Sequence, residues 1–182
     1  MQTAVLLVLL GGCVCSVQSG DESQNLQTRV ENLERSLLQL QNPPRVAFTA
    51  GLNPNNEQGN YGPYNIDTTI LFKRVLTNVG NNYNFAKGIF TAPVKGLHFF
   101  YFSLMATFDP APNMRAALKR NTEFVAYVFD EAPSDTHDSV SRADTLVLEV
   151  GDMVYVELER GKSIYGLRGQ NNMFSGFLLH PL

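Results

Sequence analysis

This sequence contains very little cysteine. Cys13 and Cys15 are the only two, and both lie close to the N-terminus. If the N-terminal segment is removed from the mature chain, no disulfide can form. The fold must then be stabilised by packing or by association between chains. The same removal leaves no cysteine nucleophile for catalysis.

Other absences exclude whole classes of protein. The 14 glycines follow no three-residue period, which excludes a collagen stalk. Charged residues make up only 17% of the chain and the formal net charge is −3, so no basic field attracts nucleic acid. Hydrophobic residues reach 44%, which is too high for a disordered chain. No Asn-X-Ser/Thr sequon occurs, so we expect no N-glycosylation.

The N-terminal segment has the features of a secretory signal peptide. Residues 1–20 contain no Asp, Glu, Lys or Arg, and Ala4 to Leu10 form an apolar run. Val17-Gln18-Ser19 then places small or modest side chains where a signal peptidase cleaves. We therefore expect a signal peptide over residues 1–19 and a secreted, extracellular mature chain. The alternative is an uncleaved membrane anchor, but a span needs about 20 apolar residues, and Gly11-Gly12 interrupts this run.

Residues 21–42 are expected to form a short coiled coil. Apolar residues recur with the 4, 3, 4, 3 spacing of a heptad seam at Leu26, Val30, Leu33, Leu37 and Leu40. Arg29 and Glu34 occupy a g position and the following e position, which predicts an ion pair between chains. The block Arg29–Glu34 resembles the R-h-x-x-h-E motif of three-stranded coiled coils. The alternative for so short a seam is a single amphipathic helix that packs on its own domain.

Residues 43–182 have the pattern of an all-β domain. Short apolar and aromatic runs alternate with Gly, Pro, Asn and Asp. This pattern predicts a sandwich or jelly roll with strands at Val46–Thr49, Thr69–Leu76, Gly88–Thr91, Leu97–Ala106, Arg115–Lys119, Phe124–Phe129, Ala143–Val150, Met153–Leu158 and Phe174–Leu179. Turns are expected at Asn53-Pro54-Asn55, Thr77 to Asn82, Pro110 to Pro112 and Gly151-Asp152, the last as a tight hairpin.

Several predicted strands are apolar on both faces. One face of Leu97–Leu104 carries Leu97, Phe99 and Tyr101, and the other carries His98, Phe100, Phe102 and Leu104. The same alternation places Phe124, Ala126 and Val128 opposite Val125, Tyr127 and Phe129. An antiparallel sandwich ordinarily has one core face and one wet face on each strand. We therefore expect neighbouring subunits to cover the second face, with long loops as the alternative cover.

The aromatic spacing along the domain resembles that of the globular-head domain family of complement C1q. The pattern consists of Phe72, Asn78, Tyr83, Phe90, Gly96, Phe100 and Phe102. Phe90–Gly96 is similar to the family's F-x-A-P-x-x-G element, and Gly151–Val156 and Phe174–Leu179 are similar to its late hairpin and closing strand. Leu158–Gly161 and Phe177–Leu182 resemble the cerebellin-like branch. His98 departs from the pattern, because the family has Tyr there.

This resemblance implies a ten-stranded jelly roll, like that of tumour necrosis factor, that assembles as a homotrimer. His98 is then expected to be a buried, hydrogen-bonded residue, or alternatively a pH-sensitive packing site. Family members are secreted recognition or organiser modules. The cysteine pair that cerebellins carry ahead of the domain is missing from the expected mature chain, so disulfide-linked higher assembly is not expected.

The resemblance also suggests a calcium site. Residues 130–138 contain four carboxylates, and Ca²⁺ prefers several oxygen ligands. Asp130 and Asp138 fall where calcium-binding relatives carry aspartates, and we expect these two residues as candidate ligands. The alternative is a solvated acidic loop.

The sequence favours binding over catalysis. His98, His137 and His180 have no metal-ligand spacing, so we expect no enzymatic activity. The favoured function is a secreted homotrimer that binds microbial or host glycans or proteins by avidity, as in innate immunity. The alternative is a cerebellin-like cell-surface or synaptic organiser. Recognition residues should lie on loops, for which the candidates are Asn53 to Tyr64, Asp109 to Met114, Ala132 to Asp138 and Ile164 to Asn172. Tyr61 and Tyr64 are either contact residues or loop packing.

Overall fold

The computed structural model describes residues 14–41, 44–53, 55, 57–106, 114–130, 138–168 and 172–182. The chain divides into two compact units, Met1–Pro43 and Pro44–Leu182. Each unit is described by itself.

The N-terminal unit contains one helix, α1 (Val14–Gln41), of 28 residues. The helix begins upstream of the expected cleavage site after Ser19, and it ends directly before the Asn42-Pro43-Pro44 sequence, as expected for residues that cannot continue a helix. The predicted helical segment is therefore confirmed, while signal-peptide cleavage stays a prediction. Within the part of the chain that the structure describes, no helix is long and apolar enough to cross a membrane.

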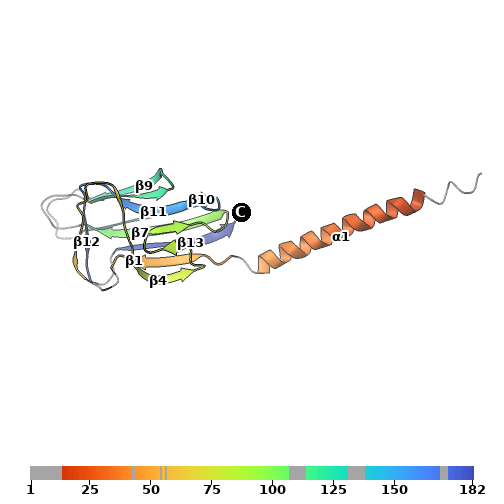
Figure 1. Cartoon of the computed structure of the whole chain (residues 1–182), viewed down its shortest axis with the longest axis horizontal. Helices are drawn as coiled ribbons and strands as arrows, with labels where there is room; N and C mark the ends of the chain where they lie inside the picture. Colours follow the sequence, from red (N-terminus) through yellow and green to blue (C-terminus); the bar gives the residue numbers. More distant parts are fainter. Residues whose placement is uncertain are drawn as a thin grey trace, which may run out of the picture. The chain divides into compact units, whose positions relative to one another are not determined.

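The C-terminal unit is an antiparallel β-sandwich (Figure 1). One sheet has the order β10 (Ser139–Leu148), β7 (Gly96–Met105), β13 (Met173–Pro181), β1 (Ala47–Gly51) and β4 (Arg74–Val79). The other has the order β5 (Tyr83–Asn84), β6 (Ile89–Thr91), β11 (Met153–Leu158), β8 (Met114–Arg120) and β9 (Glu123–Asp130), and β3 (Thr68–Thr69) pairs with β11. A two-stranded sheet joins β12 (Ile164–Gly166) to β2 (Gly59–Tyr61). The predicted all-β class is confirmed.

The core between the two large sheets is dominated by aromatic rings. Phe48 of β1 stacks on Tyr83 at 4.6 Å and on Phe90 at 5.3 Å, and it meets Phe174 edge-on at 4.9 Å. All four side chains are at most 2% exposed. Because these residues come from both sheets, their burial joins the two layers, and truncating one such ring costs about 3–5 kcal/mol. Phe and Tyr residues that lie far apart in the sequence therefore meet in this core.

The predicted hairpin at Gly151-Asp152 is wrong. β10 pairs with β7, whereas β11 pairs with β6, β8 and β3, so the chain crosses from one sheet to the other at this turn. Both strands bury apolar side chains in the same core from opposite sides. The sequence shows only two apolar runs around a glycine turn, which is also the pattern of a hairpin.

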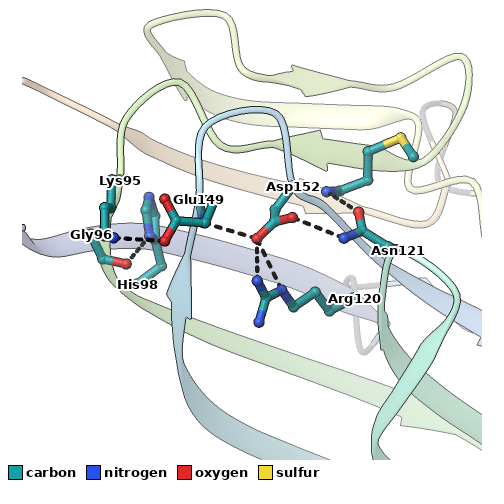
Figure 2. A network of polar contacts seen from close by, with 8 residues as sticks. Lys95, Gly96, His98, Arg120, Asn121, Glu149 and Asp152 are labelled. Atoms are coloured by element: carbon teal, nitrogen blue, oxygen red, sulfur yellow. Dashed lines mark hydrogen bonds and ion pairs between the residues drawn. The ribbon is translucent and has the colours of Figure 1, made fainter.

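A polar network fixes this crossover (Figure 2). The carboxylate of Asp152 accepts hydrogen bonds from Arg120 Nε and Nη2 at 2.9 and 2.6 Å, from Asn121 Nδ2 at 2.8 Å and from the backbone N–H of Glu149 at 2.9 Å. Asn121 also accepts a bond from the Met153 N–H at 2.9 Å. The turn between β10 and β11 is thereby joined to the turn between β8 and β9.

Smaller predictions were also wrong. The expected strand Thr69–Leu76 is interrupted between β3 and β4, and β4 continues to Val79 into the expected turn Thr77 to Asn82. The short strands β2, β5 and β12 were not predicted, since elements of two or three residues leave no periodic signal.

The face assignment of Phe124 was wrong as well. The register of β8 and β9 shifts between Leu118 and Lys119, so Val125 is an extra residue and Phe124 lies opposite Lys119. The bulge turns Phe124 away from the core, where it is 55% exposed, while Ala126 and Val128 stay buried.

Candidate functional site

The first candidate surface is the outer face of the five-stranded sheet, meaning the side that points away from the core. On β7, His98, Phe100, Phe102 and Leu104 are fully buried in the core, so the alternate residues lie on the outer face. The strand register then assigns the rest of this face, which consists of Leu97, Phe99, Tyr101, Ser103, Ser141, Ala143, Thr145, Val147, Met173, Ser175, Phe177, His180, Ala47, Thr49, Gly51, Arg74, Thr77 and Val79.

Among these paired positions, Arg74 on the edge strand β4 is the one Asp, Glu, Lys or Arg, and it lies opposite Gly51. Phe177 lies opposite Phe99 with their ring centroids 5.2 Å apart and remains 41% exposed, and Val147 is 50% exposed. Soluble surfaces ordinarily interrupt apolar residues with charge, and a contiguous apolar patch marks an interaction site. The prediction that β7 carries apolar side chains on both faces is confirmed.

The exposed side of the other sheet has a different character. Phe124 and Tyr127 of β9 stack at 4.9 Å, and the Lys119 ammonium lies 4.1 Å from the Phe124 ring centroid. Lys119 also forms an ion pair with Glu157 at 3.1 Å. Charged side chains thus cover part of the exposed aromatic surface here, as they do not on the outer face of the five-stranded sheet.

A pocket of about 580 Å³ lies beside the two-stranded sheet of β2 and β12. It is lined by the segment that follows β1, by β3 and by the ends of β11 and β12. Its volume is within the range of small-molecule sites. Tyr61 and Tyr64, the two loop tyrosines noted in the sequence, both line it. Tyr61 packs against the core and Tyr64 is 40% exposed, so both of the alternatives raised for these residues contribute.

The fold and these surfaces can be compared with known proteins. The family model of the C1q domain matches residues 47–179. The chain belongs to the C1q domain family. Caprin-2 from Danio rerio is 36% identical over 138 residues, which are 75% of this chain and 14% of that protein. The chain therefore spans only a small part of the length of that relative.

Solved structures show the same fold. The globular domain of zebrafish complement 1qA protein matches with a TM-score of 0.59 and 23% identity over 75% of this chain and 99% of that one. Eiger TNF from S. frugiperda matches at 0.58 and 15%, over 76% and 95%, and murine APRIL at 0.57 and 14%, over 74% and 99%. The predicted jelly roll of the C1q and tumour-necrosis-factor type is confirmed. C1q domains are typically extracellular recognition and signalling domains, and C1q and TNF-like domains form trimers.

The predicted coiled-coil seam lies along α1. Leu26, Val30, Leu33 and Leu37 are 51–63% exposed, and Arg29 and Glu34 are exposed as well. The side chain of Leu40 lies outside the described residues. These leucines and valine are thus available to partner chains. Association through them stays a prediction.

The candidate calcium ligands bracket a segment that lies outside the described residues. Asp130 is the last residue of β9, and Asp138 precedes β10, where its backbone carbonyl accepts a hydrogen bond from the Ala106 N–H at 2.7 Å. Residues 131–137, which include the remaining acidic residues and His137, are not described. Among the residues that are described, no three His, Cys, Asp or Glu cluster as a metal site. Calcium binding at Asp130 and Asp138 stays a prediction.

The other recognition loops divide in the same way. Residues 107–113 and 132–137 are outside the described part of the C1q domain. Ile164 is fully buried, and Asn172 serves the fold, because its Oδ1 accepts from the Met105 N–H and its Nδ2 donates to the Tyr165 carbonyl, both at 2.7 Å. Of the four candidate loops, the first therefore contributes most to the described pocket.

His98 is fully buried on the core face of β7, where the sequence placed it. Its Nδ1 hydrogen-bonds the Gly96 carbonyl at 3.1 Å, so in the neutral ring Nδ1 is the donor and Nε2 is the free acceptor (Figure 2). Nε2 has no hydrogen-bond partner among the described residues. Burial lowers the pKa of His98, and the bond to Gly96 opposes this shift. The ring lies against Phe90 and Phe100, at 5.8 and 6.3 Å.

Proposed function

We propose that this protein is a secreted homotrimer whose C1q domains bind surface glycans or proteins by avidity, in the manner of an innate-immune recognition module. The observation that carries the proposal is the outer face of the five-stranded sheet, where Arg74 on the edge strand is the one charged residue among the paired positions. The family membership supports it, because C1q and TNF-like domains form trimers and bind extracellular ligands.

The physical argument starts from the cost of leaving this face in water. Burying apolar surface contributes about 25 cal/mol per Å², and Phe177, Val147 and Val79 are each at least 41% exposed in the single chain. A closed ring of identical subunits covers the same patch on each copy, which a charged face would oppose. The small residues Ser103, Ala143 and Ser175 allow close approach of a neighbouring backbone.

The exposed seam of α1 supports the same assembly. A helix gains most of its stability from packing of its apolar face, so a coil and a domain that associate together stabilise each other. Three domains on one stub present three equal sites. Engagement of several sites raises the apparent affinity by a factor of about 10²–10⁴, as in other linked binding modules. Weak single-site binding then suffices for recognition of a repetitive surface.

Sedimentation of matched variants tests the assembly. Phe177→Glu adds a charge to the outer face of the five-stranded sheet, and Phe124→Glu adds the same charge to an exposed Phe on the other sheet, where the exposures are 41% and 55%. The wild-type chain and Phe124→Glu should sediment as trimers, and Phe177→Glu should sediment as a monomer. A monomeric wild-type chain at working concentrations would refute the proposal.

A binding screen tests the recognition role. The purified trimer is applied to glycan arrays and to whole bacteria, with the monomeric Phe177→Glu variant as the control for avidity. Binding by the trimer that falls at least tenfold in the monomer supports the proposed function. Failure to bind any glycan or microbe, together with capture of a cell-surface receptor, would favour the cerebellin-like organiser instead.

A further inference from the structure

The lining of the pocket beside β2 and β12 combines groups that together specify a ligand chemistry: a carboxylate, two tyrosine rings and an ammonium group. It is one continuous space of about 580 Å³ at the end of the sandwich where β12 is labelled in Figure 1. Its floor is apolar and is formed by Leu52, Ile70, Leu71, Leu158 and Ile164. This composition, an apolar cavity with a few polar groups, is typical of small-molecule sites.

Glu57, Tyr61 and Tyr64 supply a carboxylate and two phenol rings to the lining of the pocket. Desolvation raises the pKa of Tyr61 above its ordinary value, and the nearby charges of Glu57 and Tyr64 raise it further. All three side chains line the same pocket, so a ligand bound there can meet the carboxylate and both phenol rings. A cation among aromatic rings and a carboxylate is attracted both by the ring faces and by the negative charge.

The loop holds Glu57 in place before any ligand arrives. Asn55 Nδ2 donates to the Glu57 carboxylate at 3.2 Å, and Asn53 Nδ2 donates to the Glu57 carbonyl at 2.6 Å. The Asn53 side-chain oxygen in turn accepts from the Asn55 N–H at 2.9 Å. A preorganised carboxylate loses less conformational entropy on binding than a free one.

Lys73, which directly precedes β4, supplies a positive charge to the lining of the pocket. Within the described part of the chain, neither Glu57 nor Lys73 takes part in an ion pair. The two charges are therefore not neutralised by each other, and both remain available to a ligand. A zwitterion can pair with both charges at once, whereas a simple cation or a simple anion pairs with only one of them.

We propose that this pocket binds a small zwitterion, with an alkylated ammonium among Glu57, Tyr61 and Tyr64 and a phosphate or carboxylate at Lys73, and that phosphocholine is the representative ligand. The inference deepens the proposed function, on which it rests, by assigning a ligand subsite to the recognition module. Phosphocholine occurs both as a lipid headgroup and as a soluble or polymer-linked group. The chemistry recognised is the same in each case.

Isothermal titration of the full-length mature chain with phosphocholine, choline and inorganic phosphate tests the inference. Phosphocholine should bind more tightly than either fragment. Glu57→Gln and Tyr64→Leu should weaken both phosphocholine and choline, whereas Lys73→Gln should weaken phosphocholine about tenfold and leave choline unchanged. Glu123→Gln and Lys87→Gln, which change exposed charges outside the pocket, are the matched controls and should bind as the wild type does.

Two further measurements distinguish a lipid headgroup from a soluble ligand, and loss of the ligand site from loss of the trimer. Binding to phosphatidylcholine vesicles, but not to phosphatidylglycerol vesicles, supports a lipid headgroup, and binding only to free phosphocholine supports a soluble or polymer-linked ligand. The proposal is overturned if phosphocholine does not bind at millimolar concentration, or if all four charge variants bind equally. Sedimentation of the same samples records the trimer, so loss of the ligand site is distinguished from failure of the assembly.

Discussion

The buried histidine of β7 makes a specific prediction about pH. His98 is fully buried, with its Nε2 unpaired among aromatic rings, and burial lowers its pKa below the ordinary value. Protonation would place a positive charge and a new donor at Nε2 with no acceptor to receive it. The folded state therefore takes up this proton less readily than the unfolded state, in which histidine has a pKa of about 6.5. The contribution to stability is complete above this pH and is lost as the pH falls below it, until the lower folded pKa is reached.

The loss of stability on acidification is set by the binding of one proton to His98. Each pH unit between the unfolded and the folded pKa costs about 1.4 kcal/mol, so acidification from pH 7.5 to 5.0 should destabilise the domain by up to about 2 kcal/mol. For a domain of this size, such a loss lowers Tm by about 5–10 °C. The residues in contact with the ring are Phe90 across the core and Phe100 and Gly96 on its own strand, none of which titrates.

Thermal and urea unfolding between pH 7.5 and 5.0 checks this reasoning at fixed protein concentration, because trimer stability depends on concentration. His98→Phe should remove most of the pH dependence, whatever its effect on stability at pH 7.5. The argument is refuted if the wild type and His98→Phe lose stability in parallel on acidification.

Three further predictions concern the crossover, the core and the metal. Asp152→Asn should destabilise the domain by about 1–3 kcal/mol in urea unfolding, because the Arg120 guanidinium loses its charged partner. The hydrogen bonds from Asn121 and then from the Glu149 N–H lower the pKa of Asp152. The stability that this carboxylate contributes is therefore present at neutral pH and is lost only as the pH falls through that lowered pKa. Phe48→Ala should cost about 3–5 kcal/mol by the same assay, and an effect below 1 kcal/mol would contradict the ring contacts described above. Calcium should raise Tm, and Asp138→Ala should abolish the increase; equal melting in calcium and in chelator would exclude the site.

Much of the domain could be predicted because its strands are long and their apolar residues alternate. β7 shows this clearly: His98, Phe100 and Phe102 have the period of a strand, and all three are buried. The aromatic positions Phe72, Tyr83 and Phe90 belong to the family-like spacing in the sequence, and they lie in one core. The candidate pocket was only partly predictable. Tyr61 and Tyr64 stood out in a loop of glycine and asparagine, but nothing in the sequence brought Glu57 and Lys73 to the same cavity.

The sequence by itself determined which side chains are buried, because the composition and the period of the apolar residues are local properties of the chain. It thereby determined the all-β class, the heptad seam of α1 and the apolar character of both faces of β7. Only the tertiary structure decided which strands pair and what lies opposite what. The turn at Gly151 joins two sheets because β11 finds its partners in β6 and β8 rather than in β10, and a single bulge at Val125 turned Phe124 outward. These outcomes depend on contacts between distant segments, whose energies no local pattern contains.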